Sequence, residues 1–328
     1  MNSAAEVYPL EFIPIPCPRI WGGSKLRNEW NKDFSKDKIG ESWELSCVPG
    51  AVSLIKSGEF AGKPVTEALE KYGAAILGDK VYAKYGAELP LLFKLIDASE
   101  NLSVQVHPDD VVAKKRHNCF GKTEMWFVAQ AEKNSMLYSG FAQPVRKEYY
   151  MELIKSGKIL EMLASHTVKT GDSFFIPAGR VHGIGAGIVI AEIQQSSDVT
   201  YRIFDYHRKD SDGNERELHI AESVDVVDFN VKPSYKTEYT PHKNEAVSIA
   251  CCEHFTVNYI PLTASIKRDL GGRGSFVVYM CLTGAASLDC GGKTAALKKG
   301  STVLVPAALA GCIELHAAAE CVMLETFV

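Results

Sequence analysis

The sequence has 328 residues, of which 46% are hydrophobic and 23% charged, as in folded globular proteins. Its 36 basic and 40 acidic residues give a formal net charge of −4, which argues against a nucleic-acid-binding protein, since such proteins usually carry a basic excess. The length exceeds what one compact core usually spans, so we expect two domains, or one domain with a large elaboration.

The N-terminal segment and the cysteines point to a cytoplasmic protein. The first residues lack the basic and apolar regions of a signal peptide, and no apolar run approaches the roughly 18 residues that span a bilayer. The nine cysteines form no C-x-x-C pair, which favours reduced thiols over disulfides or a thiolate metal site. We therefore expect a cytoplasmic protein with no membrane or nucleic-acid partner.

In chain order, the hydrophobic patterns predict mainly strands. The first 60 residues are rich in proline and predict irregular structure with short strands and turns. Helical spacing marks three later segments, and short apolar or alternating runs between turn residues mark the strands. The predicted helices cover residues 64–77, 147–157 and 158–166, and the predicted strands lie within residues 89–141, 172–206 and 245–328. Many short strands with Gly and Pro turns predict a sandwich or barrel of the jelly-roll kind.

A weak internal repeat indicates that one β unit occurs twice. KTGDSFFIPAGRVHGI, residues 169–184, aligns without a gap with KKGSTVLVPAALAGCI, residues 298–313. Each copy has a turn glycine, a short apolar strand and a Pro-Ala corner, so we expect two related β-barrels. His182 of the first copy is matched by Gly311 of the second. If the first barrel holds a metal, the second has lost a ligand and is structural.

The segment NLSVQVHPDD places three polar residues at alternate positions. In a strand, alternate side chains share one face, so Ser103, Gln105 and His107 point together, away from the apolar residues between them. Such a face serves either solubility or a pocket. Asp109 and Asp110 follow Pro108 and are expected to cap a helix, without a chemical role.

Two further segments add candidate ligands. GKTEMWF alternates Lys122, Glu124 and Trp126 onto one strand face, and PAGRVHGIG places His182 just after a strand and a corner. Taken alone, each is weak, because a single histidine near a strand end is more often structural. Two imidazoles, a carboxylate and the amide of Gln105 together suit Zn²⁺ or another first-row divalent ion.

Four segments in combination resemble a known family. FKLIDASENLSVQVHPDD, GKTEMWF, IPAGRVHGIG and QQSSDVTYRIFDYHR are similar, in this order, to type I mannose-6-phosphate isomerases, in their short bacterial form. The resemblance covers most of residues 8–230 and is loose in the C-terminal part. It implies a mainly β chain of two cupin-like jelly-roll β-barrels with a few short helices. The expected domains are a catalytic cupin domain with small helical elaborations, residues 1–235, and a degenerate cupin-like barrel, residues 236–328.

The resemblance also implies a metal site and a substrate. The family's zinc ligands fall on His107, Glu124 and His182, with one zinc ion per chain. Gln105 matches a further ligand of the longer members. The substrate would be a small sugar phosphate, because the family interconverts mannose 6-phosphate and fructose 6-phosphate.

Candidate catalytic residues follow from the same resemblance, and candidate substrate-binding residues from their residue types. Arg202 matches the arginine regarded as catalytic, and Lys122 matches a lysine proposed to transfer protons or bind substrate. Lys94, Ser103 and Glu192 are expected to bind substrate. Aldose–ketose isomerisation needs a base near the carbon, an acid near the carbonyl oxygen, and positive charge where oxyanion charge develops, and these residue types fit that need.

Several alternatives stay open. The base is a lysine of lowered pKa, a water held at the metal, or Glu192. Arg202 is otherwise a structural partner of Asp198 or Asp205, and Lys94 otherwise a strand residue at a barrel rim. Two histidines and a carboxylate also fit a non-haem iron oxygenase, and a third reading is a non-catalytic, sugar-binding cupin. The sequence leaves the oligomeric state open.

Overall fold

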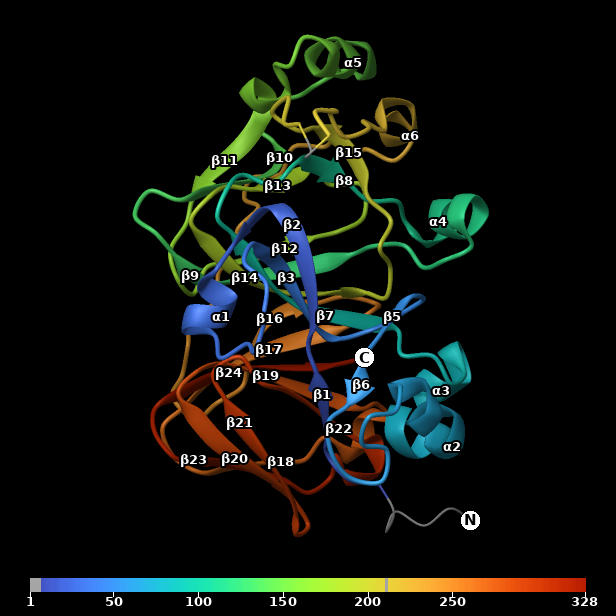
Figure 1. The fold of residues 1–328 in the computed structure, drawn as a ribbon, viewed down its shortest axis with the longest axis vertical. Helices are drawn as coiled ribbons and strands as arrows, with labels where there is room; N and C mark the ends of the chain where they lie inside the picture. Colours follow the sequence, from blue (N-terminus) through green and yellow to red (C-terminus); the bar gives the residue numbers. More distant parts are fainter. Residues whose placement is uncertain (1–6, 210–211) are drawn as a thin grey trace.

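The structure, a computed structural model, describes residues 7–209 and 212–328. Its strands form four larger sheets and one small two-stranded sheet. In Figure 1 the four larger sheets follow one another along the long axis, from a five-stranded sheet at the top to a four-stranded sheet at the bottom. The two termini of the described chain lie in the lower half of that view.

The upper two sheets form the N-terminal sandwich. The six-stranded sheet has the order β12 (Ser173–Ile176), β9 (Glu124–Ala131), β14 (Ile188–Gln195), β7 (Leu91–Ala98), β2 (Ile15–Gly23) and β3 (Ile39–Leu45). The five-stranded sheet has the order β11 (Leu163–Thr167), β10 (Met136–Phe141), β13 (His182–Ile184), β8 (Val104–Val106) and β15 (Tyr201–Phe204).

The lower two sheets form the C-terminal sandwich. The seven-stranded sheet has the order β16 (Val247–Cys251), β17 (Thr256–Leu262), β24 (Cys321–Phe327), β19 (Val277–Thr283), β22 (Thr302–Val305), β1 (Leu10–Ile13) and β6 (Leu54–Ile55). The four-stranded sheet has the order β18 (Ile266–Arg268), β23 (Ile313–Ala317), β20 (Ala285–Cys290) and β21 (Lys293–Lys298). The small sheet pairs β4 (Cys47–Val48) with β5 (Ala51–Val52).

The six-stranded sheet is covered on both faces. Every residue of β7 and β14 is buried, which explains why these strands read as nearly continuous apolar runs. One face packs toward the five-stranded sheet, where Ile96 and Ile190 share a core cluster with Ile184. The other face packs toward the C-terminal sandwich, where the rings of Phe127 and Tyr259 stack with centroids 5.5 Å apart. Side chains on the upper face of this sheet therefore lie between two sheets, shielded from solvent.

Short helices cover the outside of both sandwiches. Helix α5 (Lys147–Lys155), η1 (Ile159–Met162) and α6 (Ile220–Val224) contribute apolar residues to the cluster that packs on the five-stranded sheet. Helices α2 (Val65–Leu77) and α3 (Asp79–Tyr85) pack beside the C-terminal sandwich (Figure 1). The remaining helical elements are α1 (Lys25–Glu29), α4 (Asp110–His117), η2 (Gly271–Arg273) and η3 (Ala307–Leu309).

The predicted mainly β chain with a few short helices is confirmed. The helices predicted at 64–77 and 147–157 correspond to α2 and α5, and Asp109 caps α4 by accepting a hydrogen bond from the Val112 amide at 2.8 Å. Asp110 does not serve as the cap, since its carboxylate accepts from the Gly121 amide at 2.7 Å and the Gln195 amide group at 2.8 Å.

Two of the predicted segments are wrong in part. Only residues 159–162 of the helix predicted at 158–166 are helical, and Leu163–Thr167 form strand β11, because pairing with β10 completes the edge of the five-stranded sheet. The first 60 residues are more regular than expected, since they supply β2 and β3 to the six-stranded sheet. Irregular pairing of β2 with β3 around Cys17, Pro18 and Gly23 accommodates the prolines that suggested a loop.

The prediction of two distinct barrels is not confirmed. Among the described residues, no sheet closes on itself through its strand pairing. In addition, β1 and β6 from the N-terminal end belong to the seven-stranded sheet, where Leu10 pairs with Leu304 of β22. The boundary expected at residue 235 stays a prediction.

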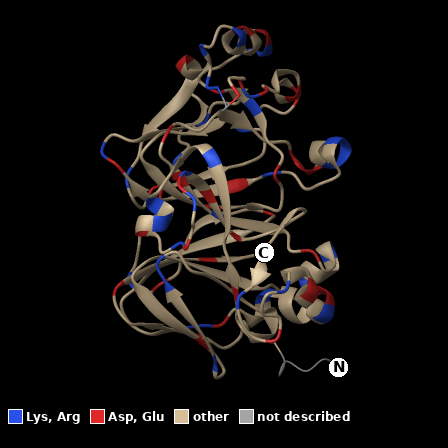
Figure 2. Cartoon of the chain, viewed as in Figure 1, with Lys and Arg blue, Asp and Glu red and all other residues tan. Residues whose placement is uncertain are grey.

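The distribution of charged residues, the cysteines and the apolar character of the helices agree with the overall composition. In the view of Figure 2, basic and acidic residues intermingle along the chain without an extended region of one sign. All nine cysteines are free thiols. No helix in the described part of the chain has the length and apolar character needed to cross a membrane.

Candidate active site

The candidate site lies between the two sheets of the N-terminal sandwich. Alternation along β7, β9 and β14 sends Phe93, Met125 and Phe127 into the lower core, and the residues between them toward the five-stranded sheet. The strand register then aligns three polar positions, because Glu192 of β14 lies opposite both Lys94 of β7 and Trp126 of β9. Pairing of these neighbouring strands therefore brings residues that are distant in the sequence into one site.

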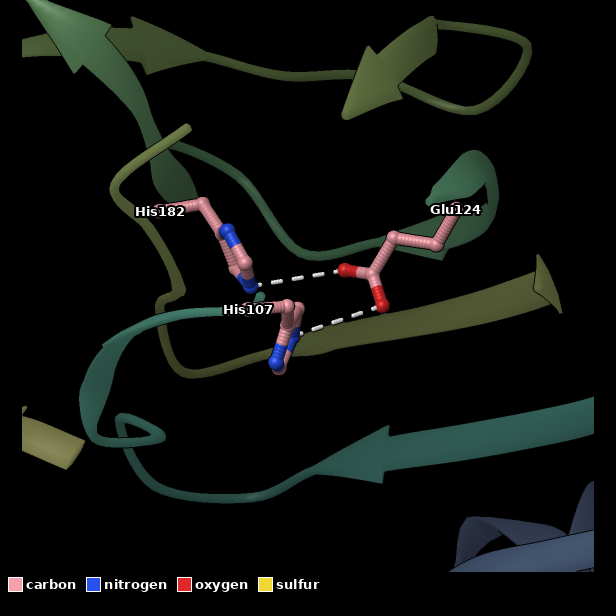
Figure 3. Close-up of side chains that lie close together, drawn as sticks. All are labelled: His107, Glu124 and His182. Atoms are coloured by element: carbon pink, nitrogen blue, oxygen red, sulfur yellow. Dashed lines mark ion pairs between the residues drawn. The ribbon is translucent and has the colours of Figure 1, made fainter. Parts of the chain in front are cut away.

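Three predicted metal ligands converge above this sheet (Figure 3). Glu124 begins β9, His182 begins β13, and His107 follows β8. Glu124 Oε1 is 3.4 Å from His182 Nε2, and Glu124 Oε2 is 3.6 Å from His107 Nε2. One ligand atom from each residue lies within 4.8 Å of the others, and all three side chains are buried. In the described part of the chain this is the one group of three or more His, Cys, Asp or Glu with such spacing.

Both imidazoles are oriented by the backbone. His107 Nδ1 lies 3.0 Å from the Val199 carbonyl oxygen, and His182 Nδ1 lies 2.8 Å from the Arg180 carbonyl oxygen. A carbonyl only accepts, so each Nδ1 carries the proton and each Nε2 presents a lone pair toward Glu124. Burial lowers the pKa of His182 to about 3 and holds that of His107 well below its ordinary value, which favours neutral, ligating rings.

The donor atoms of this group fit a divalent metal ion. Glu124 Oε1 and His182 Nε2 are buried and make no hydrogen bond within the described residues, whereas Glu124 Oε2 forms an ion pair with Lys122. A buried polar atom left without a partner costs about 1–3 kcal/mol, so two of them side by side fit a site that binds a ligand. Burial also raises the pKa of Glu124 to about 7, with Glu192 adding to the effect, and a cation at this position would reverse that shift. Two imidazole nitrogens and a carboxylate are a suitable donor set for Zn²⁺.

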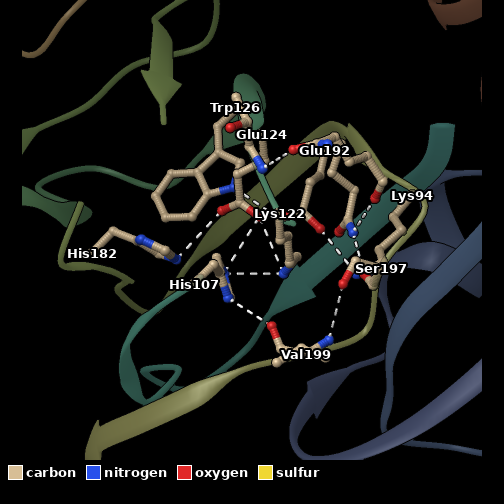
Figure 4. A network of polar contacts seen from close by, with 12 residues as sticks. Lys94, His107, Lys122, Glu124, Trp126, His182, Glu192, Ser197 and Val199 are labelled. Atoms are coloured by element: carbon tan, nitrogen blue, oxygen red, sulfur yellow. Dashed lines mark hydrogen bonds and ion pairs between the residues drawn. The ribbon is translucent and has the colours of Figure 1, made fainter. Parts of the chain in front are cut away.

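Charged side chains extend from this group along the sheet (Figure 4). Lys122 Nζ is 3.1 Å from His107 Nε2 and 3.1 Å from Glu124 Oε2. Glu192 accepts a hydrogen bond of 2.8 Å from Trp126 Nε1 and forms an ion pair of 3.1 Å with Lys94. Burial opposes the charge on Lys94, but Glu192 and Glu41 outweigh it and raise the pKa of Lys94. Lys94 is therefore a fixed cation in the resting site.

A cavity of about 360 Å³ opens beside the metal-ligand group. Its walls contain every predicted catalytic and substrate-binding residue, together with the predicted fourth ligand: Lys94, Ser103, Gln105, Lys122, Glu192 and Arg202. Gln105 lies directly opposite His182 in the β13–β8 ladder and opposite Arg202 in the β15–β8 ladder. The shared strand face predicted for Ser103 and Gln105 is thus a cavity wall, and the role of Gln105 as a ligand stays a prediction.

Arg202 has no carboxylate partner in the described structure. Asp205, a partner considered from the sequence, is paired instead with Arg208 and Arg216. The Arg202 guanidinium donates to the Glu217 carbonyl oxygen at 2.9 Å, and its Nε is buried without a hydrogen bond. Burial and the neighbouring Arg216 lower its pKa. The guanidinium is therefore available to a ligand in the cavity rather than locked in an ion pair.

Sequence reasoning missed several cavity residues. Arg19 and Glu41 lie on β2 and β3, in the part of the chain expected to be irregular, and Arg216 lies outside every predicted helix and strand. The remaining unpredicted lining residues are Trp21, Ile96, Leu102, Ile184, Asp198 and Thr200. One signal was present, because Glu41-Ser-Trp43 repeats the spacing of Glu124-Met-Trp126, and Trp43 Nε1 donates to Glu41 at 2.8 Å.

Comparisons with known proteins agree with this site. The family described as phosphomannose isomerase type I, catalytic domain, matches residues 17–140. A mannose-6-phosphate isomerase of Streptococcus mutans is 34% identical over 290 residues, covering 88% of this chain and 89% of the relative. A mannose-6-phosphate isomerase of Bacillus subtilis is 33% identical over 321 residues, covering 96% of this chain and 98% of the relative.

This chain belongs to the mannose-6-phosphate isomerase family. The fold agrees, since the crystal structure of a mannose 6-phosphate isomerase from Bacillus subtilis superposes with a TM-score of 0.88 at 28% identity, covering 98% of this chain and all of that one. The resemblance inferred from four motifs is thereby confirmed. Membership extends over both sandwiches, including the C-terminal part where the motifs were loose.

Proposed function

We propose that this protein interconverts mannose 6-phosphate and fructose 6-phosphate by moving a proton between C1 and C2 through an enediolate. One observation carries the proposal: the buried His107, Glu124 and His182 group adjoins a cavity lined by Lys94, Lys122, Arg202 and Glu192. Membership of the family supports the same activity. Neither a non-haem iron oxygenase nor a non-catalytic sugar-binding protein is favoured by these relatives.

We further propose one zinc ion per chain, held by His107, Glu124 and His182, with Gln105 as a further ligand. When bound there, the ion supplies positive charge that polarises sugar oxygens and stabilises developing oxyanion charge. The oriented Nε2 atoms and the unpartnered Oε1 of Glu124 support this assignment.

Residues of the chain would carry out proton transfer and substrate binding. Lys122 lies beside the ligand group and is placed to move a proton or to hold a substrate oxygen near C1 and C2. Arg202 offers a free guanidinium to negative charge in the cavity, and Ser103 offers a hydroxyl. Glu192 holds Lys94 in place and is the second candidate for the base. All of these groups act in a buried site, where electrostatic interactions are stronger than in water.

The domain assignment and the location of the protein are also proposals. Every residue of the site precedes residue 235, which supports a catalytic unit within residues 1–235 and a supporting unit within residues 236–328. Nine free thiols support action in a reducing compartment such as the cytoplasm.

A coupled assay tests the proposed reaction. Purified protein is given mannose 6-phosphate, and fructose 6-phosphate is followed before chelation, after chelation and after zinc is restored. Turnover that chelation abolishes and zinc restores supports the reaction and the metal together. Absence of turnover in a folded, metal-loaded protein would refute the proposed activity.

A further inference from the structure

Besides Arg202, four cations line the cavity, and they lie at two depths. The side chains of Lys94 and Lys122 are 5% and 6% exposed, whereas those of Arg216 and Arg19 are 23% and 35% exposed. Lys122 contacts two of the metal-ligand residues, so the lysines mark the inner end of the cavity, where the reaction is proposed. The two arginines therefore mark its outer end.

The outer arginines come from opposite walls and are held by carboxylates. Arg19 lies on β2 of the six-stranded sheet, and its Nη2 donates to Glu41 at 2.9 Å. Arg216 follows the last strand of the five-stranded sheet, and it pairs with Asp205 through Nε at 2.7 Å and Nη2 at 2.5 Å. A guanidinium bound through two of its nitrogens keeps donors on its free edge. The carboxylates thus position both arginines without occupying all their donors.

The carboxylate that holds Arg19 is charged at neutral pH. Burial disfavours ionisation of Glu41, but Lys94 and Arg19 outweigh it and lower the pKa of Glu41 to about 2. Glu41 accepts a second hydrogen bond from Trp43 Nε1, and Lys94 Nζ lies 5.1 Å from the centroid of the Trp43 ring. This arrangement ties the position of Arg19 to the inner part of the site.

The shape of the substrate decides what the outer end binds. In a hexose 6-phosphate, the carbons that exchange the proton and the phosphate lie at opposite ends of the chain. If C1 and C2 lie by Lys122, the phosphate lies at the other end of the cavity, whose volume of about 360 Å³ is typical of ligand sites. Guanidinium groups suit phosphate because they offer paired, charged N–H donors in a fixed plane.

We propose that Arg19 and Arg216 form the phosphate subsite, closing on the phosphate from the two sheets, with Glu41 and Asp205 as positioning residues. This inference rests on the proposed function, since it takes the orientation of the sugar from the location of the reaction. It assigns the specificity for a phosphorylated sugar to residues that do not belong to the metal-ligand group.

Binding of a hexitol 6-phosphate tests the subsite without turnover. This compound has the carbon chain and phosphate of the substrate but no carbonyl, and the matching hexitol lacks the phosphate. Calorimetry compares both ligands on metal-loaded wild type, Arg19→Gln and Arg216→Gln. Arg116→Gln is the matched control, because Arg116 is paired with Asp225 at 2.6 Å on the surface and does not line the cavity.

Each arginine variant is expected to weaken binding of the hexitol phosphate by about 10- to 100-fold, as loss of a charged hydrogen bond does. Binding of the hexitol should stay within about twofold in the same variants. Arg19→Lys should recover part of the loss, and Glu41→Gln should lower the preference for the phosphorylated ligand by a smaller factor.

Two results would overturn the subsite. One is wild-type affinity for the hexitol phosphate in both arginine variants, and the other is an equal loss of affinity for both ligands. The proposed reaction fails separately: a protein that binds the hexitol phosphate through Arg19 and Arg216 but does not isomerise mannose 6-phosphate keeps the subsite and loses the activity.

Discussion

The two sandwiches of this protein share one strand plan but differ in the contacts made by the acidic side chains at their centres. The order β12-β9-β14-β7 of the six-stranded sheet matches the order β22-β19-β24-β17 of the seven-stranded sheet. The order β11-β10-β13-β8 of the five-stranded sheet likewise matches β21-β20-β23-β18. The short sequence repeat falls within this correspondence, with turn glycines Gly171 and Gly300 at φ of +94° and +84°.

The register extends the correspondence to individual residues. Trp126 lies opposite Glu192, which lies opposite Lys94. In the C-terminal sandwich, Tyr279 lies opposite Glu325, which lies opposite Asn258. When the two sheets are aligned strand by strand, the equivalent residues are Trp126 and Tyr279, Glu192 and Glu325, and Lys94 and Asn258. The central acid accepts from its aromatic partner at 2.8 Å in both copies.

The copies diverge in the groups around that acid. Glu325 also accepts from Asn258 at 2.8 Å and from Arg268 at 2.7 Å and 2.9 Å, so its carboxylate is fully paired. The places of Glu124 and His182 are taken by Val277 and Gly311. The acid at the centre of the C-terminal copy is fully hydrogen-bonded, whereas Glu124 Oε1 and His182 Nε2 of the N-terminal copy make no hydrogen bond, which supports the proposal that the reaction takes place in the N-terminal copy.

The largest expected loss of activity comes from removing a proposed metal ligand in the N-terminal sandwich. His182→Ala should lose the bound metal and at least about 10³-fold in kcat, because the chemistry depends on charge held at this group. Metal analysis and the coupled assay on the same preparation check this. A variant with wild-type metal content would refute the ligand assignment.

Arg202→Ala separates metal binding from catalysis. It should keep its metal and lose about 10²- to 10³-fold in kcat, because the free guanidinium is the cavity's candidate for stabilising oxyanion charge. The readouts are metal content and steady-state kinetics. A kcat close to wild type would make Arg202 a structural residue.

The same substitution in both copies sharpens the comparison. Glu192→Gln should lower kcat by about 10-fold or more, since it removes the charge that fixes Lys94. Glu325→Gln should leave kcat per folded molecule unchanged but lower the free energy of unfolding by about 3–5 kcal/mol, since it leaves Arg268 without its partner. Kinetics and denaturant unfolding on both variants test this pair. Equal losses of kcat in the two variants would contradict the different roles proposed for Glu192 and Glu325.

A smaller effect is expected in the pH dependence of stability. The pKa of Glu41 is about 2 in the folded protein against 4.5 as its ordinary value, so its contribution is complete well above pH 4.5 and is lost as the pH falls toward 2. Between pH 7 and pH 4, wild type should lose about 1 kcal/mol more stability than Glu41→Gln. Urea unfolding at both pH values measures the difference, and parallel losses would contradict the charge assigned to Glu41.

The sequence was sufficient for the ligand group but not for the cavity's outer end. His107, Glu124 and His182 stand in motifs whose residue types suit a metal, so the group could be predicted before any geometry was known. Arg19 and Glu41 could not, because their role arises only when β2 and β3 pair into the six-stranded sheet. That pairing is irregular, and its prolines hide the strand pattern.

The copy of the site in the C-terminal sandwich was also only partly predictable. The repeat predicted a second, related β unit, and β22 and β23 of the C-terminal sandwich take the places of β12 and β13. It did not predict the Glu325 network, since Asn258 and Tyr279 lie outside the two repeated segments. Their equivalence lies in the register of hydrogen-bonded strands, which sequence comparison within one chain does not reveal.

The most direct test of the account is a zinc titration of the metal-free protein, with mannose 6-phosphate turnover measured at each step. The account predicts that turnover rises linearly and stops at one zinc per chain, and that no rise occurs in His182→Ala. Full turnover without metal, or an end point at two ions per chain, would contradict the claim that only the N-terminal sandwich carries the reaction centre.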